Sequence, residues 1–199
     1  MGRKAGITLA DVATAGAAIA DDKGLESATL TAVASELGIK TPSLYNHVAG
    51  LAGIRRLLAM RGSNILLGEF ETAIAGKSGI EALRAICEAD RKFASEHPGL
   101  YASFLPAPSP GEDDELYEAM AAPVYAVAHV LLDMGIPQES AIHLIRAMRA
   151  LLHGFLDLEA KGGFGMPIEI DASFDFSIEL ILEGIESAAR VSQKERAAT

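Results

Sequence analysis

Apolar residues recur every three or four positions along most of the chain, and no β-branched alternating run lies between hairpin turns. The segments with this spacing are rich in Ala, Leu, Glu and Met, which is typical of helices with one buried face. The pattern therefore predicts an all-α protein.

The first 50 residues carry three helix-start signals. Thr8, with Asp11 three residues later, predicts a capped helix over residues 8–22, which ends at a DDKG turn. Its expected apolar stripe is Leu9, Val12, Ala13, Ala17 and Ile19 or Ala20.

Thr29 predicts the cap of a second helix that ends at Gly38. A third helix should open at Thr41 and Pro42, with Thr41 as its cap and Pro42 at its first position. Two short helices that cross here should touch through apolar and small groups, namely Val33, Ala34, Leu37, Ile39, Leu44 and Val48.

Longer helical patterns follow after residue 50, which gives a small N-terminal domain over 1–50 and a larger helical bundle over 51–199. The predicted helices cover about 51–74, 79–97, 100–105, 115–135, 137–163 and 172–191. Pro98 halts one of them, and the loop PAPSPGEDD before residue 115 is the one Pro/Gly/acid-rich break. We expect the tail SQKERAAT to be frayed.

The charge is uneven along the chain. The formal net charge is −10, but residues 1–60 balance at +1, so the remaining residues carry −11. The acidity therefore belongs to the larger domain and does not exclude a nucleic acid partner for the smaller one.

The composition also indicates a compartment. Cys87 is the single cysteine, so the chain forms no internal disulfide, and neither a secretory leader nor about 18 consecutive apolar residues is found. These features favour a cytoplasmic protein with no membrane span.

The third predicted helix is polar on the side that faces away from the helix crossing. Hydrogen-bonding side chains suited to base edges and phosphates gather there, on an element narrow enough for the major groove. These residues are Lys40, Thr41, Ser43, Tyr45, Asn46 and His47. The arrangement predicts a helix-turn-helix that binds DNA.

The stretch TLTAVASELGIKTPSLYNHV, within Ile7 to Val48, resembles the DNA-binding domain of the tetracycline-repressor (TetR) family of bacterial transcriptional regulators. The sequence Ser43-Leu44-Tyr45-Asn46-His47 matches that family's S-L-Y-x-H pattern. Residues 149–185 resemble a ligand-domain subfamily named for a tryptophan-histidine-glycine signature, although this chain has Leu152 before His153 and Gly154.

The resemblance implies about nine helices, with three in the DNA-binding head and a larger effector domain. It also implies a homodimer, a palindromic operator and release by a small-molecule effector, usually in a repressor. Tyr45 and His47 would lie near phosphates, while Lys40, Thr41, Ser43 and Asn46 would reach bases or phosphates. Arg3 and Lys4 would form an arm that enters a neighbouring groove.

One departure from the family pattern concerns the residues after the recognition helix. Family members usually carry Lys or Arg there, whereas this chain reads Val48-Ala49-Gly50-Leu51-Ala52. A phosphate contact at this point would come from backbone amides at the start of the fourth helix.

Homodimerisation is also predicted from the residues. Helices 138–160 and 173–190 have apolar stripes that are wider than packing against one core requires, which favours a two-fold four-helix interface. The stripes are Ile142, Ile145, Met148, Leu151, Leu152, Phe155 and Leu156, and Phe174, Phe176, Ile178, Ile181, Leu182 and Ile185.

Aromatic, Met and His residues at helical spacing could line an effector pocket, although ordinary core packing also explains them. The candidates are Phe93, His97, Tyr101, Phe104, Met120, Tyr125, His129, Met148 and His153. The effector's identity does not follow from the pattern.

No metal, cofactor or catalytic motif was found, so the sequence predicts no cofactor and no enzyme activity. Glu88, Asp90, Arg91 and Lys92 are interpreted as surface ion pairs, and the acidic run from Glu112 to Glu115 as helix capping. The alternatives are an all-helical enzyme or structural dimer with a fortuitous helix-turn-helix, and a DNA-binding protein that a protein partner controls.

Overall fold

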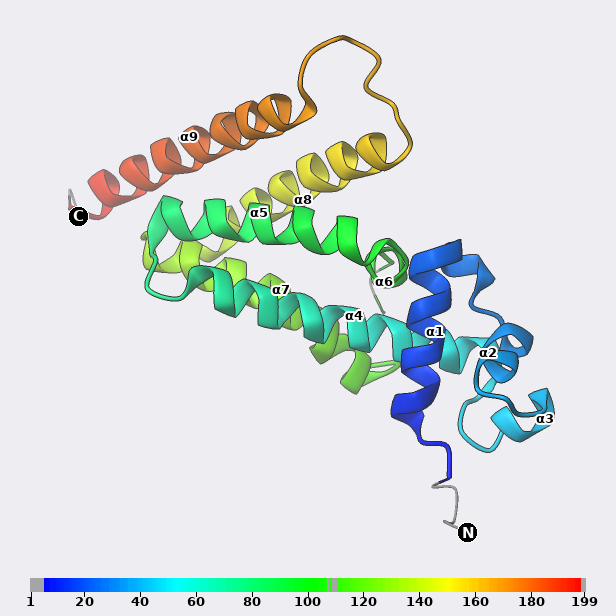
Figure 1. The fold of residues 1–199 in the computed structure, drawn as a ribbon. Coiled ribbons are helices and arrows are strands. Elements are labelled where there is room, and N and C mark those ends of the chain that lie inside the picture. The colour runs from blue at the N-terminus through cyan, green and yellow to red at the C-terminus, as the bar shows by residue number, and fades with distance from the viewer. Residues whose placement is uncertain (1–5, 107, 109–110, 198–199) are drawn as a thin grey trace. The chain divides into compact units, whose positions relative to one another are not determined.

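The computed structural model describes residues 6–106, 108 and 111–197, within which the chain forms nine α-helices, one 3-10 turn and no strand (Figure 1). The predicted all-α fold is therefore confirmed. The helices are α1 (Leu9–Lys23), α2 (Leu30–Glu36), α3 (Thr41–Leu44), α4 (Gly50–Ile74), α5 (Gly79–Glu96), α6 (Pro98–Ser103), α7 (Asp114–Asp133), α8 (Gln138–Ala160) and α9 (Ile170–Ala197). The 3-10 turn η1 (Leu25–Ser27) lies between α1 and α2.

The start of α1 is fixed by the predicted capping box. The backbone N–H of Asp11 donates to the Thr8 hydroxyl at 3.2 Å, and the backbone N–H of Thr8 donates to the Asp11 carboxylate at 2.8 Å. Each end of the box satisfies an amide that the helix leaves without a partner. Val12 and Ala20 of the predicted stripe are fully buried, whereas Leu9 is half exposed.

The chain divides into two compact units. The first comprises Met1–Ile65 and Glu96–Ala121, and the second comprises Leu66–Ser95 and Ala122–Thr199. In the first unit, α1, α2, α3, α6 and the first half of α4 bury a core that includes Val12, Val33, Leu44, Ile54 and Leu58.

In the second unit, α5, α8, α9 and most of α7 bury a separate core. The largest fully buried side chains include Leu83, Ile86 and Phe93 of α5 and Phe174, Ile178 and Leu182 of α9. Helices α8 and α9 run antiparallel and are joined by a loop over residues 161–169 (Figure 1).

Two boundary predictions were wrong. Helix α3 begins at Thr41, so Lys40 is its N-cap residue and Thr41 is not. Helix α9 continues through most of the tail that we expected to be frayed, because Gln193 donates a hydrogen bond from Nε2 to the carbonyl oxygen of Met134 at 2.9 Å.

Candidate DNA-binding surface and effector region

The pair α2–α3 is held by a buried contact and a glycine turn. Thr29 caps α2 by accepting a hydrogen bond from the Ala32 backbone N–H at 3.1 Å. Gly38 follows with a φ of +67°, a left-handed conformation that a side chain would strain. Where the two helices meet, Ala34 exposes 1% of its surface and Leu44 exposes none. The two helices are therefore positioned as the sequence predicts.

The outer side of α3 carries most of the predicted polar residues. Lys40, Ser43, Tyr45 and Asn46 are exposed, and Thr41 and His47 are half-buried. Tyr45 exposes 59% of its surface, which is a large fraction for an aromatic side chain. Tyr45, Asn46 and His47 lie in the turn that follows the four-residue helix. Arg3 and Lys4 lie outside the described residues.

Two further basic residues of the first unit face acids of the same unit. Arg55 forms an ion pair with Glu26 at 3.0 Å. Arg56 pairs with Asp113 at 2.5 Å and with Glu115 at 2.6 Å. Hydrogen bonds from the Arg56 guanidinium and from the backbone N–H of Leu116 lower the pKa of the Asp113 carboxyl, which lies just before α7. Both arginines are therefore engaged within the protein and add little to a DNA-facing charge.

Helix α1 is tied to α6 by an aspartate. Asp21 accepts hydrogen bonds from the backbone N–H groups of Gly99 at 2.9 Å and Leu100 at 3.0 Å, and His97 Nδ1 lies 3.0 Å from its other oxygen. We call this arrangement the Asp21 clasp. The backbones of α1 and α6 are in close contact at this point. A Cβ atom added at Gly99 would lie only 2.1 Å from the Ala20 carbonyl carbon, so a side chain does not fit there.

The predicted effector residues fall in both units. In the first unit, His97 joins the Asp21 clasp, Tyr101 packs edge-on against Phe104 at 5.6 Å between ring centroids, and Met120 is half-buried. Gly62 of α4 lies against the Phe104 ring, which a Cβ there would approach to 2.9 Å.

In the second unit, the predicted effector residues differ in burial. Phe93 and Met148 are buried, His153 is half-buried, and Tyr125 and His129 lie on the exposed side of α7. Their role in ligand binding stays a prediction.

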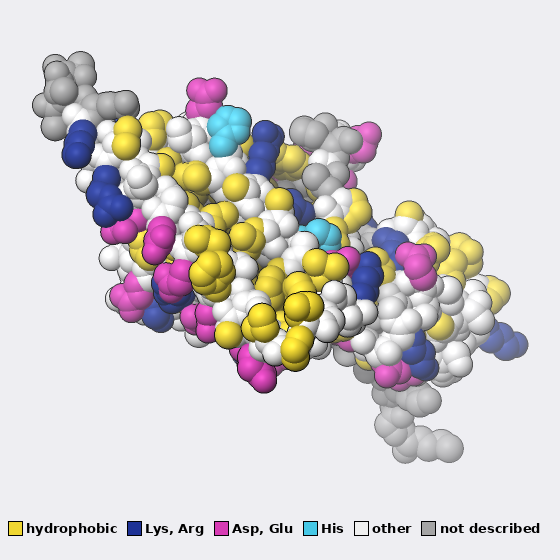
Figure 2. All heavy atoms as spheres, turned by 90° about the horizontal axis from the view of Figure 1, so that it is seen from above, with side chains coloured by type: hydrophobic (Ala, Val, Ile, Leu, Met, Phe, Trp, Pro, Cys, Tyr) yellow, Lys and Arg dark blue, Asp and Glu magenta, His cyan; other side chains and the backbone are white. Residues whose placement is uncertain are grey.

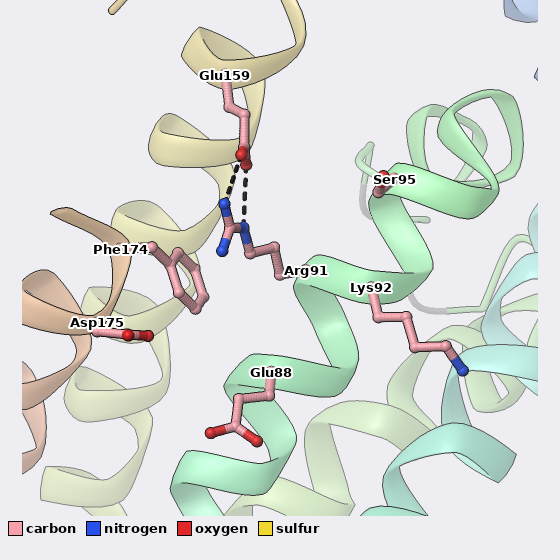
Figure 3. Close-up of a pocket in the computed structure, with 7 residues that line it drawn as sticks. All are labelled: Glu88, Arg91, Lys92, Ser95, Glu159, Phe174 and Asp175. Atoms are coloured by element: carbon pink, nitrogen blue, oxygen red, sulfur yellow. Dashed lines mark hydrogen bonds and ion pairs between the residues drawn. The ribbon is translucent and has the colours of Figure 1, made fainter. Parts of the chain in front are cut away.

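The run Glu88 to Lys92 is only partly the ion-paired surface that we predicted. Arg91 donates from Nε to Glu159 at 3.1 Å, and its guanidinium lies 4.5 Å from the Phe174 ring centroid (Figure 3). It also donates from Nη2 to Asp171 at 2.8 Å. Lys92 Nζ lies 3.6 Å from Glu69. An open hollow of about 410 Å³ lies here. It is lined by Glu88, Arg91, Lys92, Ser95, Glu159, Phe174 and Asp175.

The interpretation was wrong for Asp90, which is 8% exposed. Burial raises the pKa of this carboxyl to about 7, against the smaller opposing effect of the Arg149 charge. The helical spacing of the sequence could have predicted this burial. Asp90 lies on the same face of α5 as Leu83, Ile86 and Phe93, which are all buried. The aspartate of the clasp was missed because its partners lie 78 and 79 residues away.

Other chemistry is sparse in the described part of the chain. Three or more metal-ligating side chains do not come together there. Burial raises the pKa of the Cys87 thiol to about 12, which removes its thiolate reactivity at neutral pH. Among the described helices, none is long and apolar enough to cross a membrane.

Comparison with known proteins places this architecture in a family. Residues 83–181 match the family described as tetracyclin repressor-like, C-terminal domain. The uncharacterized HTH-type transcriptional regulator YobS of Bacillus subtilis is 33% identical over 186 residues, which covers 93% of this chain and 96% of YobS.

Solved structures show the same fold. The transcriptional regulator SCO7222, a TetR from Streptomyces coelicolor, aligns with a TM-score of 0.69 at 16% identity, over 92% of this chain and 100% of that one. A TetR variant from Acinetobacter baumannii in complex with minocycline aligns with a TM-score of 0.68 at 19% identity, over 92% and 98% of the two chains.

The helix-turn-helix, the all-helical fold and these relatives together define a transcriptional regulator. The chain belongs to the TetR family.

Proposed function

We propose that this protein represses transcription by binding a palindromic operator as a homodimer, and that a small-molecule effector releases it. The observation that carries the DNA-binding part is the exposed polar surface of α3 and the following turn, displayed on a buried crossing with α2. A helix presented in this way fits the major groove, where side chains read base edges.

The proposed contacts divide by chemistry. Tyr45 and His47 hydrogen-bond to phosphates, while Lys40, Thr41, Ser43 and Asn46 reach bases or phosphates. The Arg3–Lys4 arm enters a neighbouring groove. Because Ala49, Leu51 and Ala52 offer no cation, the first-turn amides of α4, which starts at Gly50, hold a further phosphate.

Dimerisation through α8 and α9 is supported by exposed apolar and small residues. On α9, Phe176, Leu180 and Val191 expose 66%, 56% and 53% of their surfaces. They share one helix face with Gly184 and Ser187, and the buried stripe from Phe174 to Ala189 lies on the opposite face. We call this exposed stripe the α9 seam.

Helix α8 has a matching face. Ala147, Ala150, Gly154 and Leu158 are exposed at helical spacing, and a Cβ added at Gly154 would meet nothing within 4 Å. Small residues let a second helix approach closely, and a two-fold axis brings the same faces of two protomers together. Figure 2, seen from above the view of Figure 1, shows hydrophobic side chains gathered on this side of the protein among acidic ones.

Effector release is supported by the likeness to the minocycline-bound TetR structure and by the helical second unit. A ligand can release DNA only if it binds the released conformation more tightly than the DNA-bound one. In this proposal the protein acts in the cytoplasm, needs no cofactor and catalyses no reaction.

The test is binding of the full-length protein to DNA that flanks its own gene, measured by fluorescence anisotropy across a salt series. We expect tight, salt-dependent binding that a Tyr45→Ala/His47→Ala variant weakens at least about tenfold. A Tyr125→Ala/His129→Ala variant, which removes an exposed pair of the same residue types from α7, is the matched control.

Equal affinity for random DNA, or equal losses in both variants, would contradict the assignment of the α3 surface. If the flanking DNA lacks the operator, selection of bound fragments from the whole genome supplies the duplex for the same comparison.

A further inference from the structure

Arg91 of α5 connects three helices of the second unit through one guanidinium group. It donates two hydrogen bonds to Glu159 in the last turn of α8, from Nε at 3.1 Å and from Nη2 at 2.5 Å. The same Nη2 donates to Asp171 in the first turn of α9 at 2.8 Å. The two carboxylates therefore converge on one nitrogen atom, at the end of the α8–α9 pair where the connecting loop lies (Figure 1).

The ring of Phe174 on α9 extends this contact. The Arg91 guanidinium lies 4.5 Å from its centroid, and Figure 3 shows the two side chains close to each other. The same ring meets Phe155 of α8 edge-on, with 5.3 Å between centroids. Phe174 exposes 2% of its surface, so α5, α8 and α9 all pack at this ring. We call the set of Arg91, Glu159, Asp171 and Phe174 the Arg91 clamp.

The clamp differs from an ordinary surface ion pair. Isolated exposed pairs contribute little to stability, whereas bidentate arginine–carboxylate contacts within a network are the exception. Arg91 exposes 20% of its side chain and Glu159 exposes 29%, so solvent screens this bond only in part. Asp171 exposes 85%, so its bond contributes mainly direction. Directional bonds complement the buried stripe of α9, because apolar burial favours contact but no particular angle.

The clamp lies beside residues that the proposed dimer would use. Leu158, next to Glu159 on α8, exposes 47% of its surface, and Phe176, two residues after Phe174 on α9, exposes 66%. Leu158 belongs to the exposed face of α8, and Phe176 belongs to the α9 seam. A change in the angle between α8 and α9 at this end would therefore misalign these two apolar side chains.

We propose that Arg91 is a positioning residue for dimerisation. It holds the loop end of the α8–α9 pair at the angle at which Leu158 and Phe176 face a second copy of this chain together. Without the guanidinium, the Glu159 and Asp171 carboxylates would repel each other at the point where they now share a donor. The loop end would open, and the surface presented to the partner would lose its shape. This inference rests on the dimer of the proposed function and on no property of DNA binding.

Analytical ultracentrifugation of the full-length protein over a concentration series, without DNA, measures the dimer dissociation constant. Arg91→Met removes the charge and the hydrogen bonds, so dimerisation should weaken at least about tenfold. Lys92→Met is the matched control, because it removes the same charge from the next position of α5. The ion pair that it breaks, with Glu69 at 3.6 Å, involves neither α8 nor α9. This control should dimerise as the wild type does.

Two further variants separate positioning from a general loss of stability. Arg91→Met/Glu159→Gln/Asp171→Asn also removes the repulsion between the two acids, so it should dimerise at least about threefold more tightly than Arg91→Met. Arg91→Lys keeps the charge but lacks the planar fork that bridges both acids, so its affinity should fall between those of the wild type and Arg91→Met. Circular dichroism shows whether each variant keeps its helices.

Wild-type affinity in Arg91→Met, an equal loss in Lys92→Met, or a triple variant no tighter than Arg91→Met would overturn the role of Arg91 and leave the dimer proposal in place. If Arg91→Met does not fold, Arg91→Lys replaces it, and a dimer as tight as that of the wild type would contradict the clamp. A wild type that stays monomeric throughout the series would overturn both the clamp and the proposed dimer.

Discussion

At the scale of single residues, two aspartates of the chain lie in opposite environments. Arg55, Arg56 and Arg91 each meet a carboxylate partner, and Asp21 accepts two backbone hydrogen bonds. Asp90 is buried on α5, and this burial raises the pKa of its carboxyl to about 7. Asp21 therefore stabilises a helix start, whereas the burial of Asp90 makes its ionised form unfavourable.

The raised pKa of Asp90 predicts a pH dependence of stability. Because its pKa rises from 3.8 to about 7 on folding, the native state holds a proton that the unfolded state releases. The unfolding free energy should therefore fall as the pH rises from about 4 to about 7, by an amount on the order of a few kcal/mol.

Urea unfolding of Asp90→Asn and wild type at pH 5 and pH 8 measures this effect. The variant should be more stable than wild type at pH 8 by about 1–3 kcal/mol, and this advantage should shrink or reverse at pH 5. Glu88→Gln serves as the control on the same helix. An Asp90→Asn difference that is the same at both pH values would show that the carboxyl has no raised pKa.

At the scale of elements, local signals account for most helix starts and tertiary contacts account for the rest. Thr8, Asp11 and Thr29 cap their helices as the sequence predicts, because a cap acts within three residues. The length of α9 could not be predicted, since its end is held by a hydrogen bond between Gln193 and Met134, 59 residues apart.

The candidate DNA surface was also largely predictable, because exposure follows from the apolar positions that α2 and α3 use against each other. The effector residues were less predictable. Met, His and aromatic side chains at helical spacing look alike whether they end up buried, as Met148 does, or exposed, as Tyr125 does. Only tertiary packing decides between these outcomes.

The Asp21 clasp gives a prediction for α1 and α6. In Asp21→Ala, the Gly99 and Leu100 amides lose their acceptor, so the unfolding free energy should fall by about 1–2 kcal/mol. Hydrogen exchange at these two amides should accelerate. Asp22→Ala, which removes the neighbouring exposed carboxylate, should change neither quantity; equal effects of both variants would mean that the clasp does not stabilise the contact.

The α9 seam gives a prediction for assembly. Leu180→Glu places a charge on an exposed apolar site, so it should leave the helicity of the protomer unchanged while sedimentation shifts from dimer to monomer. Glu186→Gln, on the charged flank of the same helix, should remain dimeric. A Leu180→Glu protein that sediments as wild type does would place the interface elsewhere.

At the scale of the whole molecule, the proposed repressor needs two DNA-binding heads that act as one unit. In the proposed dimer, each α3 covers a single half-site, and the dimer fixes the separation of the two. Binding should therefore depend on the spacing between half-sites as well as on their sequence. The relationship to the TetR family supports this proposal of a dimer on two half-sites.

The most direct measurement is the affinity and stoichiometry of the protein on its selected operator, compared with the same half-sites moved apart by about 5 base pairs, half a helical turn. We predict an integral number of dimers on the selected operator and a loss of affinity of at least about tenfold when the half-sites are moved to opposite faces of the DNA. Single protomers bound to each half-site, with no effect of spacing, would contradict the account of a dimeric operator-binding regulator.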